Sequence, residues 1–303
     1  MLANVVLGAI DAGAEIVGVF RYEQTSTNPL KLFLKDIFNP DPEVTLLKQL
    51  KVNQIRLKSA NSTQFRKLLL NLNVDMLIVG TWKERLRKET FDIPKIASIN
   101  VHPSLLPKYR GPNPYLQTIL NGEKQTGVTL HLIDEGFDSG AILSQKKIEI
   151  QDTDTSKELR ERTVREARIL IRDFIQDLDT KIITPIAQSK KYATYFPNIK
   201  GDEKMLDFTY QTSDEISRTI RALHPFLRTY ITYQDKFFVV DPYNFQIQLE
   251  DVTHFKPGTI IAKDPEKQSL TIVCKDRKAI KFKNLKLYKN PLMTKRYIEK
   301  YVL

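Results

Sequence analysis

The sequence predicts an α/β protein with a doubly wound, mainly parallel sheet that lacks its first strand, followed by a small carboxyl-terminal β-barrel (OB-like). Short apolar runs alternate with helical patterns in the first half of the chain, whereas the second half holds one helix and several short β-like runs. The length of 303 residues suits two domains. We place these domains at residues 1–190 and 191–303.

The predicted first domain alternates strands with helices. Strands are expected at five short apolar runs, residues 15–20, 75–79, 97–101, 126–133 and 141–150. An amphipathic helix is expected at residues 63–70, and a long helix of mixed charge at residues 154–178 closes the domain. This alternation is typical of βαβ units.

The amino end of the chain departs from this pattern. The chain opens inside a helical pattern that runs from Met1 to Asp11. A doubly wound sheet normally begins with a strand and a glycine turn before that helix. That strand usually lies in the middle of the sheet, so its loss should remove many buried contacts. We therefore expect a start codon placed too late or a truncated gene.

The predicted second domain follows a linker at residues 193–197 and begins with a helix at residues 213–223. Six β-like runs come next, at residues 229–233, 237–240, 245–249, 259–262, 270–273 and 279–287. From Lys191 to the end there are 20 Lys/Arg against 13 Asp/Glu, a net charge of +7 out of +11 for the whole chain. A basic barrel is a common way to hold single-stranded nucleic acid. A solvated lysine-rich face remains an equally good interpretation of the charge.

Composition excludes several classes of protein. With 41% hydrophobic and 27% charged residues, the chain is globular rather than fibrous or disordered. The apolar run at residues 76–79 is far too short to span a bilayer, and no secretory signal is present. Cys274 has no partner for an internal disulfide, and four scattered histidines give no zinc-binding spacing. We expect a cytoplasmic protein without a metal; the oligomeric state stays open, with a monomer as the default.

The most informative segment is residues 99–111, where a predicted strand gives way to a loop with two prolines. Asn100 and His102 are two residues apart on an extended backbone, so both side chains point to the same face. The carboxyl end of a strand is where open α/β sheets place their ligand crevice. An amide and an imidazole side by side on a rigid support could stabilise a polarised carbonyl oxygen.

The second informative segment is the turn at residues 134–140, in which Asp138 lies between two glycines. A carboxylate brought near His102 would orient the imidazole ring. Taken singly, each of these residues has a structural interpretation: a cap, a turn or a hydrogen-bonded histidine. We interpret His131, inside an apolar strand, as a packing residue.

Taken together, the motifs of this chain support a conclusion that none of them supports alone. Its pieces, in order and spacing, are residues 100–111, 121–123, 126–129 and 134–140, with further likeness at residues 193–195 and 220–226. This pattern resembles the folate-dependent formyltransferase family, most closely the members that act on methionyl-tRNA. The resemblance covers nearly the entire chain and is strongest from residue 75 to residue 143.

The resemblance implies a set of site residues and substrates. The family's catalytic asparagine, histidine and aspartate fall on Asn100, His102 and Asp138. The folate-binding positions fall on Ser104, Leu105, Leu106, Pro107 and Asp134. The implied donor is 10-formyltetrahydrofolate, and the implied acceptor is the amine of initiator methionyl-tRNA. Asn100 and a protonated His102 would stabilise the tetrahedral oxyanion, without a metal.

Three alternatives to this reaction stay open. The acceptor could be an amino sugar nucleotide, or water in a hydrolase of the formylated folate. The chain could also be a catalytically lapsed relative that only binds RNA. Two departures from the family bear on the choice: residues 22–42 lack a basic insertion, and residues 82–85 replace a small, glycine-containing sequence at the folate crevice. We interpret Trp82 there as a core residue rather than one that stacks on the pterin.

Overall fold

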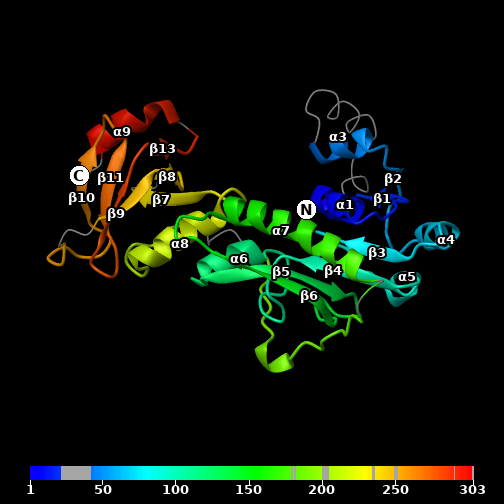
Figure 1. Cartoon of the computed structure of the whole chain (residues 1–303). Coiled ribbons are helices and arrows are strands. Elements are labelled where there is room, and N and C mark those ends of the chain that lie inside the picture. Colours follow the sequence, from blue (N-terminus) through cyan, green and yellow to red (C-terminus); the bar gives the residue numbers. More distant parts are fainter. Residues whose placement is uncertain are drawn as a thin grey trace. The chain divides into compact units, whose positions relative to one another are not determined.

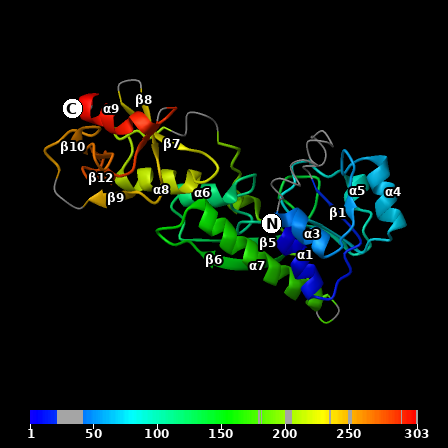
Figure 2. The same ribbon diagram turned by 90° about the horizontal axis from the view of Figure 1, so that it is seen from above.

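The computed structural model describes residues 1–21, 42–178, 180, 182–199, 205–233, 236–248, 252–289 and 291–301. These residues form two compact units, and each is described here by itself (Figures 1 and 2). The first unit comprises Met1–Pro114, Gln125–Glu149 and Glu161–Phe196. The second comprises Tyr115–Lys124, Ile150–Arg160 and Pro197–Leu303. The predicted boundary at residue 190 thus lies near the last of these divisions, but two earlier segments also belong to the second unit.

The first unit contains a mixed sheet in the order β3-β4-β5-β6. Its strands are β3 (Met76–Val79), β4 (Ala97–His102), β5 (Gln125–Leu132) and β6 (Ile142–Glu149). The β3–β4 pair is parallel, whereas β4–β5 and β5–β6 are antiparallel. A separate parallel pair joins β1 (Val19–Phe20) to β2 (Gln54–Ile55). The α/β prediction is confirmed, but this four-stranded sheet is mixed rather than mainly parallel, since only β3–β4 is parallel. The short turn between β5 and β6 requires those two strands to be antiparallel.

Helices cover both faces of this sheet. The helices of the first unit are α1 (Leu2–Asp11), α3 (Pro42–Gln49), α4 (Thr63–Asn71), α5 (Lys88–Phe91) and most of α7 (Ser156–Asp177), which begins in the second unit. Apart from Pro114, α6 (Pro114–Leu120) belongs to the second unit. Along β3, Met76 and Ile78 pack into a cluster with α1 and α7, whereas Leu77 and Val79 pack into a cluster with α4. This alternation shows that α1 and α7 lie on one face of β3 and α4 on the other.

Helix α1 packs closely on α7, and Figures 1 and 2 both show the two helices alongside each other. A Cβ added to Gly8 would lie 2.5 Å from the carbonyl oxygen of Arg168, so only glycine allows this approach. Asp11 then accepts two hydrogen bonds from the Arg168 guanidinium, at 2.6 and 3.0 Å. The predicted opening helix is therefore present and anchored to α7.

The second unit is built from two antiparallel sheets around one hydrophobic core. One sheet has the order β10-β11-β12-β9 and the other the order β13-β8-β7. The strands are β7 (Thr229–Tyr233), β8 (Lys236–Val240), β9 (Phe245–Gln248), β10 (Ile260–Asp264), β11 (Ser269–Val273), β12 (Ala279–Phe282) and β13 (Lys286–Leu287). The run predicted as one strand at residues 279–287 is two strands, because Asn284 adopts a positive φ of 52° and the chain passes from one sheet to the other.

Three shorter features complete the second unit. Helix α8 (Ser213–Leu223) has the predicted bounds and begins with a capping box formed by Thr212 and Glu215. The structure ends with η4 (Pro291–Met293) and α9 (Thr294–Tyr301). Within the described ranges no helix is both long and apolar enough to cross a membrane.

Candidate active site

The site is built at the carboxyl end of β4, where Asn100 and His102 point to the same face. Ile99 and Val101 alternate with them and are fully buried in the core cluster of α1 and α7. The pairing of β4 with β5 places His131 directly opposite Asn100. The predicted pair is therefore joined by a histidine from the neighbouring strand.

Asp138 joins these residues from the turn between β5 and β6. Its Oδ1 accepts a hydrogen bond of 3.2 Å from Asn100 Nδ2 and lies 3.5 Å from His102 Nδ1. Its Oδ2 accepts a hydrogen bond of 3.0 Å from the backbone N–H of Gly111. Asp138 adopts a left-handed φ of 53°, a conformation that aspartate tolerates better than most residues. The structure thus brings together the three predicted catalytic residues.

His102 lies behind Asp138. Its Nε2 donates a hydrogen bond of 2.8 Å to the backbone carbonyl of Tyr109, which fixes a proton on that nitrogen. The remaining ring nitrogen faces Asp138, and the residue is only 4% exposed. Both polar atoms of the imidazole are therefore directed at the protein itself.

His131 is a site residue that sequence reasoning missed. Its Nδ1 donates to the carbonyl of Leu132 at 2.7 Å, which leaves a lone pair on Nε2 to accept from Asn100 Nδ2 at 3.1 Å. Burial lowers the pKa of His131 from 6.5 to about 4, so the ring is neutral near pH 7. The packing interpretation is incomplete, because this histidine also fixes the orientation of the Asn100 amide.

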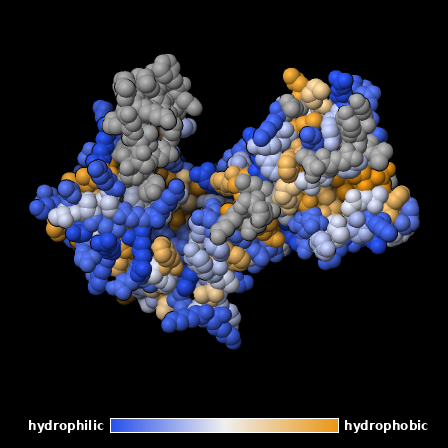
Figure 3. Space-filling model, turned by 180° about the vertical axis from the view of Figure 1, so that it is seen from behind, coloured by the Kyte–Doolittle hydropathy of each residue, from blue (hydrophilic) through white to orange (hydrophobic). Residues whose placement is uncertain are grey.

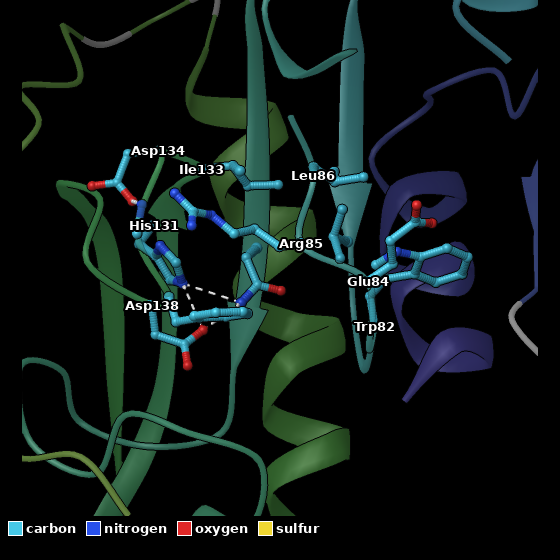
Figure 4. A pocket seen from close by; sticks show the side chains of 12 residues that line it. Trp82, Glu84, Arg85, Leu86, His131, Ile133, Asp134 and Asp138 are labelled. Atoms are coloured by element: carbon cyan, nitrogen blue, oxygen red, sulfur yellow. Dashed lines mark hydrogen bonds and ion pairs between the residues drawn. The ribbon is translucent and has the colours of Figure 1, made fainter. Parts of the chain in front are cut away.

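A pocket opens against this network (Figure 4). Asn100, Asp138 and His131 form part of its wall, and His102 is not among its lining residues. Apolar side chains supply another part of the wall, those of Val79, Trp82, Leu86, Ile133 and Phe137. Glu84, Arg85 and Asp134 add charged groups. The pocket therefore combines an apolar surface with hydrogen-bonding groups, as small-molecule sites commonly do.

Trp82 and Asp134 both line this pocket. The partly buried Trp82 ring packs against the α4 cluster, 5.1 Å from the ring of Phe20, and also lines the pocket, so its interpretation as a core residue stays a prediction. The Asp134 carboxylate accepts hydrogen bonds from Ser139 Oγ, at 2.8 and 3.0 Å, and from the backbone N–H of Gly136 at 3.0 Å. Asp134 therefore shapes the turn that presents Asp138.

The loop at residues 104–107 is held mainly by the protein. Ser104 is fully buried and donates to the carbonyl of Lys108, and Leu106 is 3% exposed. Thr129 and Gln145 hydrogen-bond to the backbone of this loop at distances of 2.6 to 3.2 Å. This pocket is not lined by Ser104, Leu105, Leu106 or Pro107. Their contact with folate stays a prediction.

A segment that follows α7 ties the two loops of the site together. The Gln188 amide donates to the backbone carbonyls of Asp138 and Gly140, at 2.9 and 2.7 Å. Its oxygen accepts from Arg110, at 3.1 and 2.7 Å. Farther on, Thr194 Oγ1 accepts from the backbone N–H of Tyr109 at 2.8 Å. One side chain thus positions the turn of Asp138 against the loop that contacts His102.

Two sequence families match this chain. The formyl transferase family matches residues 12–175, and the formyl transferase C-terminal domain matches residues 198–301. A methionyl-tRNA formyltransferase of Enterococcus faecalis is 34% identical over 245 residues, which span 79% of this chain and 75% of that protein. One from Bacillus subtilis is 28% identical over 261 residues, or 85% and 78% of the two chains.

A solved structure has a similar fold. It is an N-formyltransferase from Helicobacter canadensis in complex with folinic acid and dTDP-3-aminofucose. Its TM-score is 0.60 at 20% identity, over 81% of this chain and 82% of that one. At this identity the likeness establishes the fold.

The depressed pKa of His131 makes the stability of the protein depend on pH. Because the folded-state pKa is about 4 and the unfolded value 6.5, the unfolded chain takes up the proton first as the pH falls. Stability contributed by the neutral ring should be complete above pH 6.5 and should decline towards pH 4, by about 3 kcal/mol. Urea unfolding at pH 7.5 and pH 5 measures this decline. His131→Gln should flatten it, whereas the exposed His254→Gln should not; equal pH dependence in both variants would contradict the assignment.

Proposed function

Because this chain belongs to the formyl transferase family, we propose that it transfers a formyl group from 10-formyltetrahydrofolate to the amino group of initiator methionyl-tRNA. The observation that carries the proposal is the Asn100–His131–Asp138 network in the wall of a pocket that is otherwise largely apolar. This network places a hydrogen-bond donor and a proton acceptor side by side, which are the two groups that acyl transfer to an amine requires.

The pocket suits a pterin as the formyl donor's ring system. Val79, Leu86 and Ile133 offer an apolar surface for a flat ring. Asp134 offers a carboxylate to the amino and ring N–H groups of such a heterocycle, whereas the Glu84 carboxylate is already held by Ser59, Ala60 and Asn61. We expect Val79, Leu86, Ile133 and Asp134 to contact the ring, rather than the buried Ser104 and Leu106.

The chemistry proceeds by attack of a neutral amine on the formyl carbon. The new bond joins the acceptor nitrogen to that carbon, and the bond from the carbon to the folate nitrogen breaks. Both N–H groups of Asn100 are already directed, one at His131 and one at Asp138. The tetrahedral oxyanion would take the second of these in place of Asp138. The released carboxylate would accept the proton of the attacking amine and pass it to the leaving nitrogen.

His102 acts in this proposal through Asp138. The sequence predicted direct contact between a protonated His102 and the oxyanion. In the structure both ring nitrogens face Tyr109 and Asp138 instead. We therefore assign His102 the task of orienting Asp138 while the proton moves. Asn100 alone is left to stabilise the oxyanion from this group of residues.

The second unit supports a nucleic-acid acceptor. It matches the family's C-terminal domain. Exposed basic side chains lie in the segment from the end of β11 through α9: Lys275, Arg277, Lys278, Lys283, Lys286, Lys289, Lys295 and Arg296. A basic surface of this kind attracts the phosphate backbone of RNA. The similar fold of a protein solved with dTDP-3-aminofucose makes an amino sugar nucleotide the second candidate acceptor.

The proposal is tested by transfer of labelled formyl from 10-formyltetrahydrofolate to initiator methionyl-tRNA. We expect transfer by the unaltered chain and a loss of about 100-fold or more in kcat for Asn100→Ala and for Asp138→Asn, because each removes a group that acts in the transition state. The exposed Ser189→Ala serves as the matched control and should keep full activity. Transfer to a dTDP-amino sugar would establish the second candidate, and formate release without an acceptor would identify a hydrolase. A folded chain that binds RNA but no folate would be a lapsed relative.

Gln188 provides a second test, of positioning. Gln188→Ala removes the two hydrogen bonds that hold the carbonyls of Asp138 and Gly140. We expect kcat to fall by roughly 10- to 100-fold while KM for both substrates and the melting temperature change little, because a small displacement of Asp138 affects the transition state most. Gln188→Glu keeps the acceptor for Arg110 but loses both donors, so it should fall equally. A rise in KM without loss of kcat would show that Gln188 has no such role.

A further inference from the structure

The outer face of the β13-β8-β7 sheet in the second unit carries three aromatic side chains. Along β8 the side chains alternate, with Phe238 at 0% exposure in the core and its neighbour Phe237 at 42% exposure. The register places Ile231 of β7 opposite Phe238, so Tyr230 shares the outer face with Phe237. Tyr288 directly follows β13, is 43% exposed, and donates its backbone N–H to the carbonyl of Phe237 at 2.8 Å. Aromatic side chains from three neighbouring strands therefore meet on one face.

The other sheet of this unit has no comparable face at its centre. Strand β11 lies between β10 and β12 and is buried at all five residues. Strand β8 lies between β13 and β7, and only one of its faces packs into the core. Figure 3 shows hydrophobic side chains (orange) among hydrophilic ones (blue) on the surface of the second unit. The aromatic side chains thus lie on a strand face that is open to solvent.

The three rings support one another. The ring centroids of Tyr230 and Tyr288 are 5.4 Å apart with an interplanar angle of 77°, and those of Tyr230 and Phe237 are 6.2 Å apart at 78°. These edge-to-face contacts are a favoured geometry of aromatic pairs. Tyr230 is partly buried, whereas Phe237 and Tyr288 are exposed. Tyr230 therefore orients the two rings that a ligand can reach.

Basic side chains flank these rings. The Lys289 Nζ lies 5.8 Å from the centroid of the Tyr288 ring, within the range of a cation–π contact. Lys286 of β13 is exposed on the same outer face, and the exposed Arg228 directly precedes β7. None of the residues that form β7, β8 and β13 is acidic. The face is therefore both aromatic and positively charged.

This combination fits the unpaired nucleotides of an RNA. A base that is not paired offers a flat face to an aromatic ring, and its phosphates attract the neighbouring cations. A duplex also offers phosphates, but its bases are stacked on one another inside the helix. A second copy of this chain would bring the same cations to the face, in a protein whose net charge is +11. Charge therefore favours a nucleic acid, and the aromatic rings favour one with unpaired bases.

We propose that Phe237 and Tyr288 stack on unpaired bases of the RNA acceptor, while Lys286 and Lys289 contact the adjoining phosphates. The identity of the acceptor rests on the proposed function. What is added is a second mode of recognition, because a basic surface alone attracts paired and unpaired RNA alike. Stacking tolerates any base, so this face would select single-stranded over double-stranded segments rather than a particular sequence.

The test measures binding of the full chain to a fluorescein-labelled, unstructured RNA of about eight nucleotides and to a blunt RNA duplex. Phe237→Leu and Tyr288→Leu remove a ring but keep an apolar side chain on an exposed face, and circular dichroism checks that the fold is kept. Tyr210→Leu is the matched control, because Tyr210 is 74% exposed in the same unit and lies outside this cluster. Fluorescence anisotropy at several salt concentrations gives Kd and its salt dependence.

Phe237→Leu and Tyr288→Leu should each weaken binding of the single strand by about 10-fold, and they should leave duplex binding and the salt dependence unchanged. Lys286→Gln should instead reduce the slope of log K against log salt by about 0.7, because one phosphate contact is lost. An equal loss for Tyr210→Leu, or unchanged affinity of the two ring variants, would overturn the proposal. Self-association of the chain that Phe237→Leu abolishes would assign the face to a second copy instead.

These measurements need neither folate nor catalysis, so they are separate from the formyl-transfer assay. Single-strand binding that depends on the rings, in a chain that transfers no formyl group, would refute the proposed function alone. Formyl transfer to methionyl-tRNA with an unchanged KM in both ring variants, together with unchanged RNA affinity, would refute the stacking face alone.

Discussion

The carboxylate of Asp138 is the group on which the geometry of the site depends. A carboxylate whose side chain is only 17% exposed must find hydrogen-bond donors in the protein. Asp138 finds them on β4 and on the loop after it, through Asn100, His102 and the backbone of Gly111. The strand β4, the loop that follows it and the turn that contains Asp138 are thereby fixed to one another. Glycine is also required at position 111, since a Cβ there would lie 2.3 Å from the carbonyl oxygen of Phe196.

This dependence explains which parts of the site the sequence could predict. Asn100 and His102 lie two apart at a strand end, and alternation alone places them on one face. His131 could not be found in this way, because its contact with Asn100 depends on the register between β4 and β5, which the composition of either strand does not determine. Gln188 is 50 residues from Asp138 along the chain, and no local sequence pattern predicts its two hydrogen bonds to the turn.

The same distinction holds for the fold. Helix α8 and strand β7 have the predicted bounds, because their amphipathic patterns and the capping box are local signals. The predicted strand at residues 15–20 is formed only at Val19 and Phe20. Its apolar residues are those of a buried strand, but the regular conformation also requires a backbone partner, and among the described strands β1 pairs with β2 only, at Val19 and Phe20. The apolar sequence favours a strand, but hydrogen bonding to a neighbouring strand determines how many of its residues form one.

The two parts of the candidate site have different supports. Asn100, His131 and Asp138 rest on β4, β5 and their turn, and in the sheet order each of these strands is paired on both sides. The opposite wall of the pocket includes Val79 of β3, together with Trp82 and Leu86, and these three residues pack into the α4 cluster. Strand register therefore sets the hydrogen-bond network, whereas the packing of α4 against β3 sets the apolar wall. Because a closely packed cluster responds to any change of volume within it, a substitution in the α4 cluster should alter the apolar wall and leave the hydrogen bonds of Asn100 in place.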